Sequence, residues 1–229
     1  SCERLFNPGV WHRPVVVLSN NDGCIVARSN EIKALGVPMG APMYQYKALL
    51  QKHNTAIFSS NYQLYADISA RIMCVIKTFV PNVEVYSIDE AFVQLAEDKN
   101  HEAFALDLKQ TVLQWVGIPV SIGIAPTKTL AKAANYIAKK KTVSGVFQCD
   151  LTGIDKMLTH VPLGDLWGVG RNMFKKFSCS GITTSLALKK SDPLQVRKSF
   201  GLVYQTMVME LPGTPCLLLD KSVPRKNII

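Results

Sequence analysis

Short apolar runs alternate with longer helical patterns up to about residue 150. Four apolar residues from Val15 predict a buried strand, the polar sequence NNDG at 20–23 predicts a turn, and residues 24–27 predict the returning strand. The pattern then predicts a short helix at 30–35 that Gly36 ends, a helix at about 42–53, a strand at 56–59 and a helix at 61–79.

The middle of the chain continues this alternation around a pair of carboxylates. Apolar runs at 83–88 and 91–95 predict two strands in a tight hairpin, with Asp89 and Glu90 at the junction. A helix at about 101–116 and a strand at 118–124 follow. The helix predicted at 127–140 has an apolar face and a second face that carries lysines, namely Lys128, Lys132 and Lys139.

Beyond Asp150 the hydrophobic pattern is mostly helical, with breaks at glycines and at Pro193. The whole order of elements predicts an α+β fold in which helices cover one face of an antiparallel sheet. No apolar run approaches the length that crosses a bilayer, and the first residues, SCER, lack the form of a signal peptide. The six cysteines are scattered, as in reduced cytoplasmic proteins, so we expect a cytoplasmic location.

The charge balance favours a polyanionic partner. The net charge is +9, and five lysines without any acid lie between Pro126 and Lys141. No basic segment carries a large apolar face, which favours nucleic acid over a membrane surface. Lysines that serve only solubility are the alternative explanation of the charge.

The carboxylates Asp89 and Glu90 are the first candidates for chemistry. Hard divalent cations such as Mg²⁺ prefer oxygen ligands on rigid elements, and phosphoryl transfer with two metal ions needs several carboxylates close together. Taken alone, an Asp-Glu pair is weak evidence for such a site, because most such pairs lie in solvated surface turns.

Five segments in a fixed order give the pair its context. They are VVVLSNNDGCIVAR at 15–28, ALGVPMG at 34–40, SIDEAF at 87–92, VSIGIAPTKTLAKAAN at 120–135 and LWGVGR at 166–171. Together they closely resemble the Y-family DNA polymerases, in particular the bacterial UmuC-like branch that supplies the catalytic subunit of DNA polymerase V. The resemblance covers nearly the whole chain.

The resemblance implies a polymerase fold and activity. The fold would comprise small α/β fingers at 1–60, a palm with an antiparallel sheet at 61–146 and a helical thumb with a helix-hairpin-helix at 147–229. The activity would be error-prone translesion DNA synthesis in the SOS response, in which deoxynucleotides are added to a primer 3′ end under the direction of a template.

The resemblance also implies roles for individual residues. Asp89 would ligate Mg²⁺, and Glu90, in the same metal and catalytic motif, would lie beside the primer 3′ hydroxyl. Lys132 matches a lysine that binds the incoming triphosphate. Lys33 stands where many members carry arginine, so it keeps the charge for the triphosphate without the planar guanidinium. The neighbouring Arg28 has no evident role.

Further residues are candidates for contact with DNA. Lys128 adds a second cation one turn before Lys132 on the same helix face; a solvated helix face is the alternative. Gly168 and Gly170 precede a helix, where glycine lets backbone N–H groups approach a phosphate. Arg171 and Lys175 would strengthen that contact electrostatically. A simple tight turn is the alternative explanation of the two glycines.

Expected partners are primer–template DNA, deoxynucleoside triphosphates and, by the resemblance, a UmuD-like accessory subunit, a sliding clamp and RecA. Y-family chains begin with a strand that carries the first metal-binding aspartate and a sugar-screening aromatic residue, whereas this sequence begins just after that segment, at Ser1. The sequence also stops where the linker to the little-finger and clamp-binding regions is expected, at 224–229. An inactive DNA-binding remnant is therefore an alternative function. Another palm-like enzyme, such as a cyclase, is a further alternative, which is disfavoured because Gly168, Gly170 and the basic helices that follow suit duplex DNA.

Overall fold

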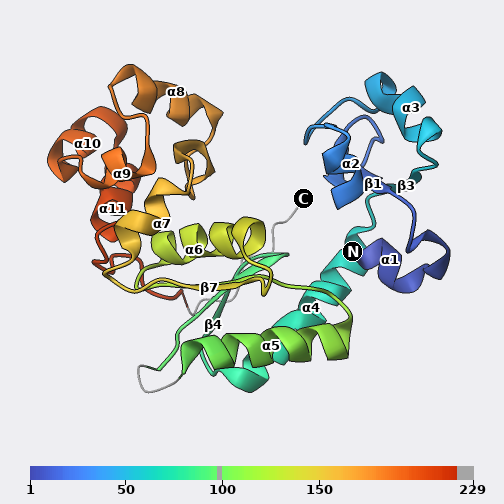
Figure 1. Cartoon of the computed structure of the whole chain (residues 1–229), viewed down its shortest axis with the longest axis horizontal. Helices are drawn as coiled ribbons and strands as arrows, with labels where there is room; N and C mark the ends of the chain where they lie inside the picture. Colours follow the sequence, from blue (N-terminus) through green and yellow to red (C-terminus); the bar gives the residue numbers. More distant parts are fainter. Residues whose placement is uncertain (97–99, 221–229) are drawn as a thin grey trace. The chain divides into compact units, whose positions relative to one another are not determined.

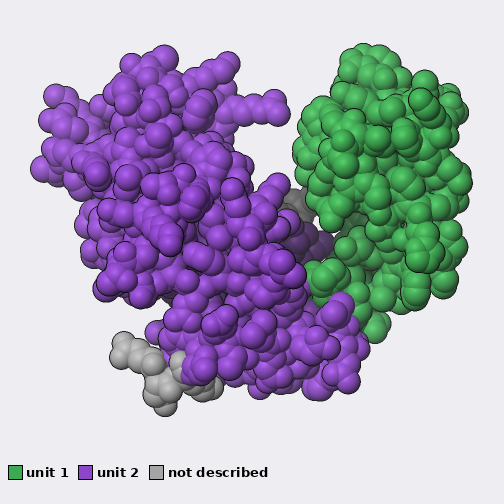
Figure 2. All heavy atoms as spheres, in the orientation of Figure 1, with its two compact units in different colours: residues 1–74, 116–119 green, residues 75–115, 120–229 purple. Residues whose placement is uncertain are grey.

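The computed structural model describes residues 1–96 and 100–220, which fall into two compact units (Figures 1 and 2). The first unit contains Ser1–Cys74 and Val116–Pro119. The second contains Val75–Trp115 and the described residues from Val120 onward. The segment 224–229, where the linker is expected, lies outside the described residues.

The first unit is built around a three-stranded sheet. Its elements are α1 (Cys2–Phe6), the 3₁₀ helix η1 (Pro8–Val10), β1 (Val15–Leu18), β2 (Ile25–Arg28), α2 (Asn30–Ala34), α3 (Met43–Lys52), β3 (Ala56–Ser59) and the first part of α4 (Tyr62–Phe79). The strand order is β2-β1-β3, in which β1 pairs antiparallel with β2 and parallel with β3. All four residues of β1 are buried because this strand is central, as its uninterrupted apolar run predicts.

The second unit contains two separate strand pairs and two long helices. Its first elements are β4 (Val83–Ser87), β5 (Glu90–Val93), α5 (His101–Val116), β6 (Ile122–Ile124), α6 (Lys128–Lys141) and β7 (Val146–Gln148). The prediction of antiparallel pairing holds for β4 and β5, whereas β6 and β7 run parallel. The strand predicted at 118–124 is shorter, since it begins at Ile122, and the three-residue β7 was not predicted at all.

Helix α6 packs directly on β6 and β7 (Figure 1). This close approach depends on Gly123 in β6. A Cβ atom at that position would lie 2.1 Å from the backbone nitrogen of Asn135 and 2.5 Å from the carbonyl oxygen of Ala131, both on α6. Only glycine therefore allows α6 to take the position from which its lysines reach the hairpin.

The remainder of the second unit is helical, as the sequence predicts. It comprises α7 (Ile154–Thr159), the 3₁₀ helix η2 (Leu163–Asp165), α8 (Arg171–Cys179), α9 (Ser185–Lys189), α10 (Pro193–Phe200) and α11 (Leu202–Glu210). One hydrophobic core joins these helices to α6, and Phe177, Leu188 and Leu130 of α6 are all fully buried in it.

The α+β fold class is thus confirmed, while the division into fingers, palm and thumb stays a prediction. Within the described parts of the chain, no helix is both long enough and apolar enough to cross a membrane.

Candidate functional site

The predicted hairpin is present, and both carboxylates lie at its tip. Ser87 pairs with Glu90 across the two strands, so Ile88 and Asp89 form a two-residue connection. The Ser87 hydroxyl donates to Asp89 Oδ1 at 2.7 Å, and the Asp89 N–H donates back to Ser87 Oγ at 3.4 Å. Ser87 therefore holds the exposed Asp89 carboxylate in place from within the turn.

One face of the hairpin is directed at α6. Side chains two positions apart on a strand share a face, which groups Glu84 with Tyr86 on β4 and Glu90 with Phe92 on β5. Lys132 forms an ion pair with Glu90, and Lys128 forms one with Glu84 at 2.5 Å. Because residues four apart on a helix also share a face, both lysines of α6 reach the same surface of the hairpin.

The hairpin also supplies aromatic surface to both ammonium groups. Lys128 Nζ lies 5.2 Å from the ring centroid of Phe92, and Lys132 Nζ lies 5.5 Å from that of Tyr86. The Lys128–Glu84 pair is the more enclosed, with side chains 11% and 13% exposed, whereas Glu90 is 38% exposed. Lys132 is thus the lysine that solvent, or an anion from solvent, reaches more easily.

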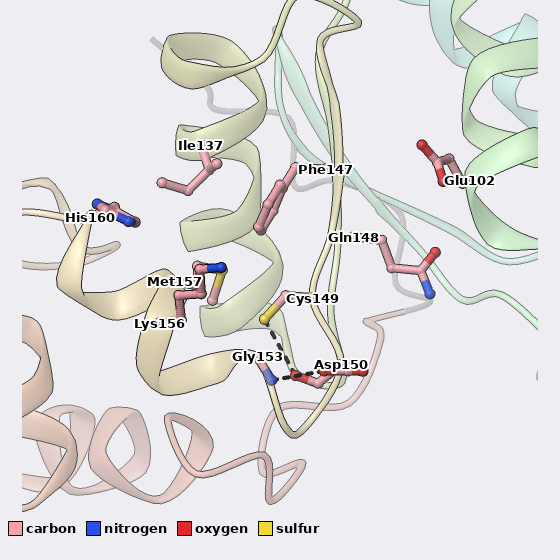
Figure 3. A pocket seen from close by; sticks show the side chains of 10 residues that line it. All are labelled: Glu102, Ile137, Phe147, Gln148, Cys149, Asp150, Gly153, Lys156, Met157 and His160. Carbon is pink, nitrogen blue, oxygen red and sulfur yellow. Dashed lines mark hydrogen bonds between the residues drawn. The ribbon is translucent and has the colours of Figure 1, made fainter.

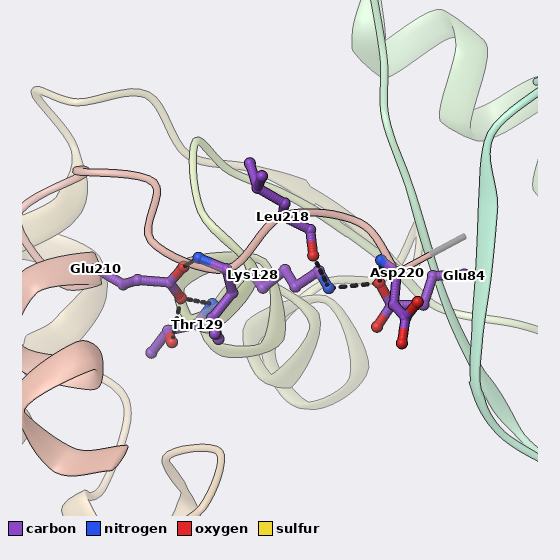
Figure 4. Close-up of polar contacts among 7 residues, drawn as sticks. Glu84, Lys128, Thr129, Glu210, Leu218 and Asp220 are labelled. Atoms are coloured by element: carbon purple, nitrogen blue, oxygen red, sulfur yellow. Dashed lines mark hydrogen bonds and ion pairs between the residues drawn. The ribbon is translucent and has the colours of Figure 1, made fainter. Parts of the chain in front are cut away.

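A buried carboxylate fixes the start of α6 (Figure 4). Glu210 is fully buried at the end of α11 and accepts hydrogen bonds from the Thr129 N–H at 3.0 Å and the Thr129 hydroxyl at 2.6 Å. It also accepts from the N–H groups of Cys216 at 3.2 Å and Leu217 at 2.9 Å. A negative group at a helix N-terminus is favoured by the helix dipole, so Glu210 stabilises α6 where the site lysines begin.

Lys128 has internal partners beyond Glu84. Its Nζ donates to the carbonyl oxygen of Leu218 at 2.8 Å, and the Asp220 N–H donates to Glu84 Oε2 at 2.6 Å (Figure 4). The structure therefore brings Lys128 together with the end of the described chain. Its contact with DNA stays a prediction.

Lys33 lies in the first unit, in a hollow of about 200 Å³ that Arg4 and Arg28 also line. Its Nζ donates to Asn30 Oδ1 at 3.2 Å. The Nε atoms of Arg4 and Arg28 are buried and have no hydrogen-bond partner in the described structure. The Ser29 hydroxyl and, to a smaller extent, Arg4 lower the pKa of Glu31. The sequence left Arg28 without a role, and the structure places it among the cations of this hollow.

The loop before α8 is sterically open at Gly170, whereas a Cβ atom at Gly168 would lie 3.2 Å from Cε of Met207. Gly168 has a φ of +86°, which favours glycine, and Gly170 caps α8 without a side-chain hydrogen bond. A Cβ atom at Gly170 would meet nothing within 4 Å. Arg171 and Lys175 are exposed on α8 and form no ion pair in the described part of the chain.

The sequence reasoning missed Trp167, although it directly precedes this glycine loop. Its Nε1–H donates to the Tyr86 hydroxyl at 3.1 Å, and the two rings meet edge to face with centroids 5.4 Å apart. The sequence did carry a signal for the partner of Trp167: the alternation in β4 places Tyr86 on the same face as Glu84.

A second hollow, of about 530 Å³, lies beside β7 (Figure 3). Its lining includes apolar side chains, such as Phe147 and Met157, and polar ones, such as Asp150 and His160. Burial raises the pKa of the lining thiol of Cys149. None of the site residues predicted from the sequence lines this hollow.

Comparisons with known proteins agree with the resemblance. A model of the impB/mucB/samB family matches residues 1–136. The UmuC protein of Salmonella typhimurium is 45% identical over 237 residues, which covers all of this chain and 56% of that protein. The DNA polymerase IV of Corynebacterium diphtheriae is 29% identical over an alignment that covers 88% of this chain and 45% of that protein. The chain thus spans about half the length of these curated relatives.

Solved structures share the fold. A ternary complex of Dbh has a TM-score of 0.76 at 24% identity, over 92% of this chain and 62% of that one. A Y-family DNA polymerase chimera built on Dbh has a TM-score of 0.80 at 22% identity, over 97% of this chain and 67% of that one. Because the family model matches more than half of the sequence, the chain belongs to the impB/mucB/samB family.

Proposed function

We propose that this chain carries three parts of a translesion DNA polymerase. They are the hairpin with Asp89 and Glu90, the lysines that would bind the incoming triphosphate, and the loop at Gly168 and Gly170 that would bind duplex DNA. Such an enzyme adds deoxynucleotides to a primer 3′ end and serves the SOS response. The observation that carries the proposal is the meeting of Lys128 and Lys132 with Glu84 and Glu90 on one face of the hairpin, next to Asp89.

Lys132 is the residue proposed to bind the incoming triphosphate. Its ammonium is partly exposed and is balanced by Glu90, which is itself accessible to solvent. A polyphosphate that enters the site offers Lys132 several anionic oxygens in place of a single carboxylate. Lys132 would then turn from Glu90 to the phosphates and leave the Glu90 carboxylate beside the primer 3′ hydroxyl.

The carboxylates are suited to hold part of a magnesium site. Asp89 is exposed, is oriented by Ser87 and has no ion-pair partner among the described residues. Within residues 1–96 and 100–220, however, no three His, Cys, Asp or Glu side chains are grouped so that they could hold a metal ion. Asp89 and Glu90 therefore fit as contributors to the ligand set and not as the whole of it. Bound Mg²⁺ would stabilise the charge that develops on the attacking and leaving oxygens.

The loop at Gly168 and Gly170 is proposed to follow the phosphates of the primer–template duplex. Its open backbone and the cations Arg171 and Lys175 would bind phosphate without reading the base sequence. Such binding suits an enzyme that must accept damaged templates. Lys33, together with Arg4 and Arg28, is proposed to offer positive charge to phosphate in the first unit.

The wider setting follows from the family. We propose a cytoplasmic location, and a UmuD-like subunit, a sliding clamp and RecA as protein partners. The name of the Salmonella relative, UmuC, supports this setting, while the named partners rest on the resemblance alone.

Primer extension tests the proposal. A labelled primer on a template would be incubated with Mg²⁺ and deoxynucleoside triphosphates, using both this chain and the chain with the flanking segments of its own gene. We expect Mg²⁺-dependent extension by the longer protein, and Asp89→Ala should reduce its rate by at least about 100-fold.

Asp107→Ala removes an exposed carboxylate from α5 and serves as the matched control, because it should leave extension unchanged. Extension that survives Asp89→Ala would contradict the assignment of the hairpin. Tight DNA binding without extension by either protein would favour the non-catalytic remnant.

A further inference from the structure

Three aromatic rings form a cluster between the hairpin and the glycine loop. Trp167 meets Tyr86 edge to face at 5.4 Å between centroids and meets Phe92 at 5.5 Å in a tilted arrangement. Tyr86 and Phe92 contact each other at 5.8 Å. Pairs with this geometry are favourable beyond the apolar area that they bury. Trp167 is the member of the cluster that comes from the loop.

The same rings support both site lysines. Lys132 Nζ lies over Tyr86, and Lys128 Nζ lies over Phe92. The Trp167 Nε1–H donates to the Tyr86 hydroxyl, so the indole fixes the orientation of the ring over which Lys132 lies. A continuous series of contacts therefore runs from Trp167 through Tyr86 to Lys132 and ends at Glu90.

Trp167 cannot shift without the loop that would approach DNA. Leu166 and Val169, on either side of it, are 3% and 4% exposed and anchor the segment in the core. Gly168 adopts a positive φ between them, and its carbonyl oxygen accepts a hydrogen bond from the Tyr204 hydroxyl at 3.3 Å. A phosphate bound at Gly170 would thus contact the same loop that carries Trp167, whose side chain packs on the hairpin.

We propose that Trp167 is a positioning residue that couples DNA binding at the glycine loop to nucleotide binding at Lys132. DNA on the loop holds the indole against Tyr86, and Tyr86 holds the ammonium of Lys132 where a triphosphate meets it. The inference rests on the proposed function, since it takes DNA and a deoxynucleoside triphosphate as the two ligands. Coupling of this kind is reciprocal, so each ligand tightens the binding of the other.

The experiment measures dATP affinity with and without DNA. The DNA is a primer–template whose primer ends in a dideoxynucleotide, so that binding occurs without extension, and the template offers thymine. The proteins are the unaltered chain, Trp167→Leu and the control Trp115→Leu, which removes a tryptophan that is 64% exposed on α5. We expect DNA to tighten dATP binding by at least about fivefold in the unaltered chain and in the control, and by less than about twofold in Trp167→Leu.

Two conservative variants keep the test decisive if Trp167→Leu fails to fold. Trp167→Phe and Tyr86→Phe each remove the hydrogen bond between the two side chains and keep an aromatic ring in place. Each should weaken the coupling, and the double variant should weaken it no further, because both changes remove the same bond. Independent, additive effects of the two changes would overturn the proposal.

The outcomes separate this inference from the proposed function. If the unaltered chain binds both DNA and dATP and a folded Trp167→Leu retains the full coupling, the positioning role is wrong while the polymerase assignment stands. If the unaltered chain binds neither ligand, the proposed function itself fails.

Discussion

The hairpin face and the glycine loop, which are the two regions proposed to bind phosphate, are built in opposite ways. On the hairpin face, Lys128 and Lys132 already have carboxylate partners and aromatic surface beneath them. At the loop, Gly170 faces open space and Arg171 is exposed. A ligand at the hairpin must therefore displace an internal partner, whereas a ligand at the loop needs only room for the backbone.

This difference indicates where each region is sensitive to change. The hairpin face depends on tertiary contacts that hold α6 at a short distance from the strands, so changes in packing should damage it. The loop is open at Gly170, so a side chain added at that position should impair binding and leave folding nearly intact.

The largest expected effect is at Gly123, beneath α6. Gly123→Ala would place a Cβ atom against the α6 backbone, at 2.1 Å from the nitrogen of Asn135. Because backbone cannot move aside cheaply, we expect a loss of about 3 kcal/mol in the free energy of unfolding, measured by denaturant titration. Gly170→Ala is the control and should cost at most about 1 kcal/mol, since it changes only a helix cap. Equal losses in the two variants would refute the comparison.

The next effect concerns the most enclosed ion pair of the hairpin face. Among the described residues, Lys128→Met would leave Glu84 with only the Asp220 N–H as a hydrogen-bond donor. The carbonyl oxygen of Leu218 would lose the ammonium group that donates to it. Removing one partner of an enclosed pair leaves an uncompensated charge, so we expect a loss of about 2 kcal/mol in unfolding free energy.

The double variant Lys128→Met with Glu84→Gln is the control for this charge effect. It should recover part of the loss, because the uncompensated carboxylate is then absent. A double variant that is less stable than Lys128→Met alone would show that the pair is not the cause.

The sequence predicted the local parts of the site. The hairpin with Asp89 and Glu90 at its tip follows from two apolar runs separated by polar residues, and the two faces of α6 follow from helical spacing. Each of these signals comes from residues that are only a few positions apart along the chain, where periodicity is informative.

The sequence did not predict the partners across the fold. Lys128 and Glu84 are 44 positions apart, and Trp167 and Tyr86 are 81 positions apart. No local pattern specifies such pairings, because they depend on how α6 and the glycine loop pack on the strands. The strand β7 was missed for a related reason: three residues are too few to show a period, and its parallel partner β6 lies on the far side of α6 in the sequence.

A smaller effect is expected at the loop itself. Gly170→Val should weaken the binding of primed DNA by about tenfold, because a branched side chain would fill the open space through which a phosphate reaches the N–H groups of α8. Gly168 is a poorer choice for this test, since its positive φ would strain any replacement and confuse folding with binding. Binding is measured by fluorescence anisotropy with labelled DNA at a fixed salt concentration.

The unfolding free energy of Gly170→Val serves as the control for this binding test. An unchanged DNA affinity in a folded Gly170→Val protein would show that the loop is only a turn.

The smallest effect concerns an ion pair that is open to solvent, in contrast to Lys128–Glu84. Lys189 on α9 pairs with Asp155 on α7, whose side chain is 58% exposed, and the hydrogen bond from Lys189 lowers the pKa of Asp155.

A carboxyl group whose pKa is lower in the folded state adds stability above its unfolded pKa, and that stability is lost as the pH falls through the folded pKa. Lys189→Gln should therefore reduce the unfolding free energy slightly at neutral pH, and this reduction should shrink at an acidic pH, as Asp155 becomes protonated in the folded state. Because solvent screens the pair, the loss at neutral pH should be smaller than that of Lys128→Met, and denaturant titrations of both variants at the two pH values would measure it. A difference between Lys189→Gln and the unaltered chain that grows on acidification would contradict the assignment of the pKa shift to this pair.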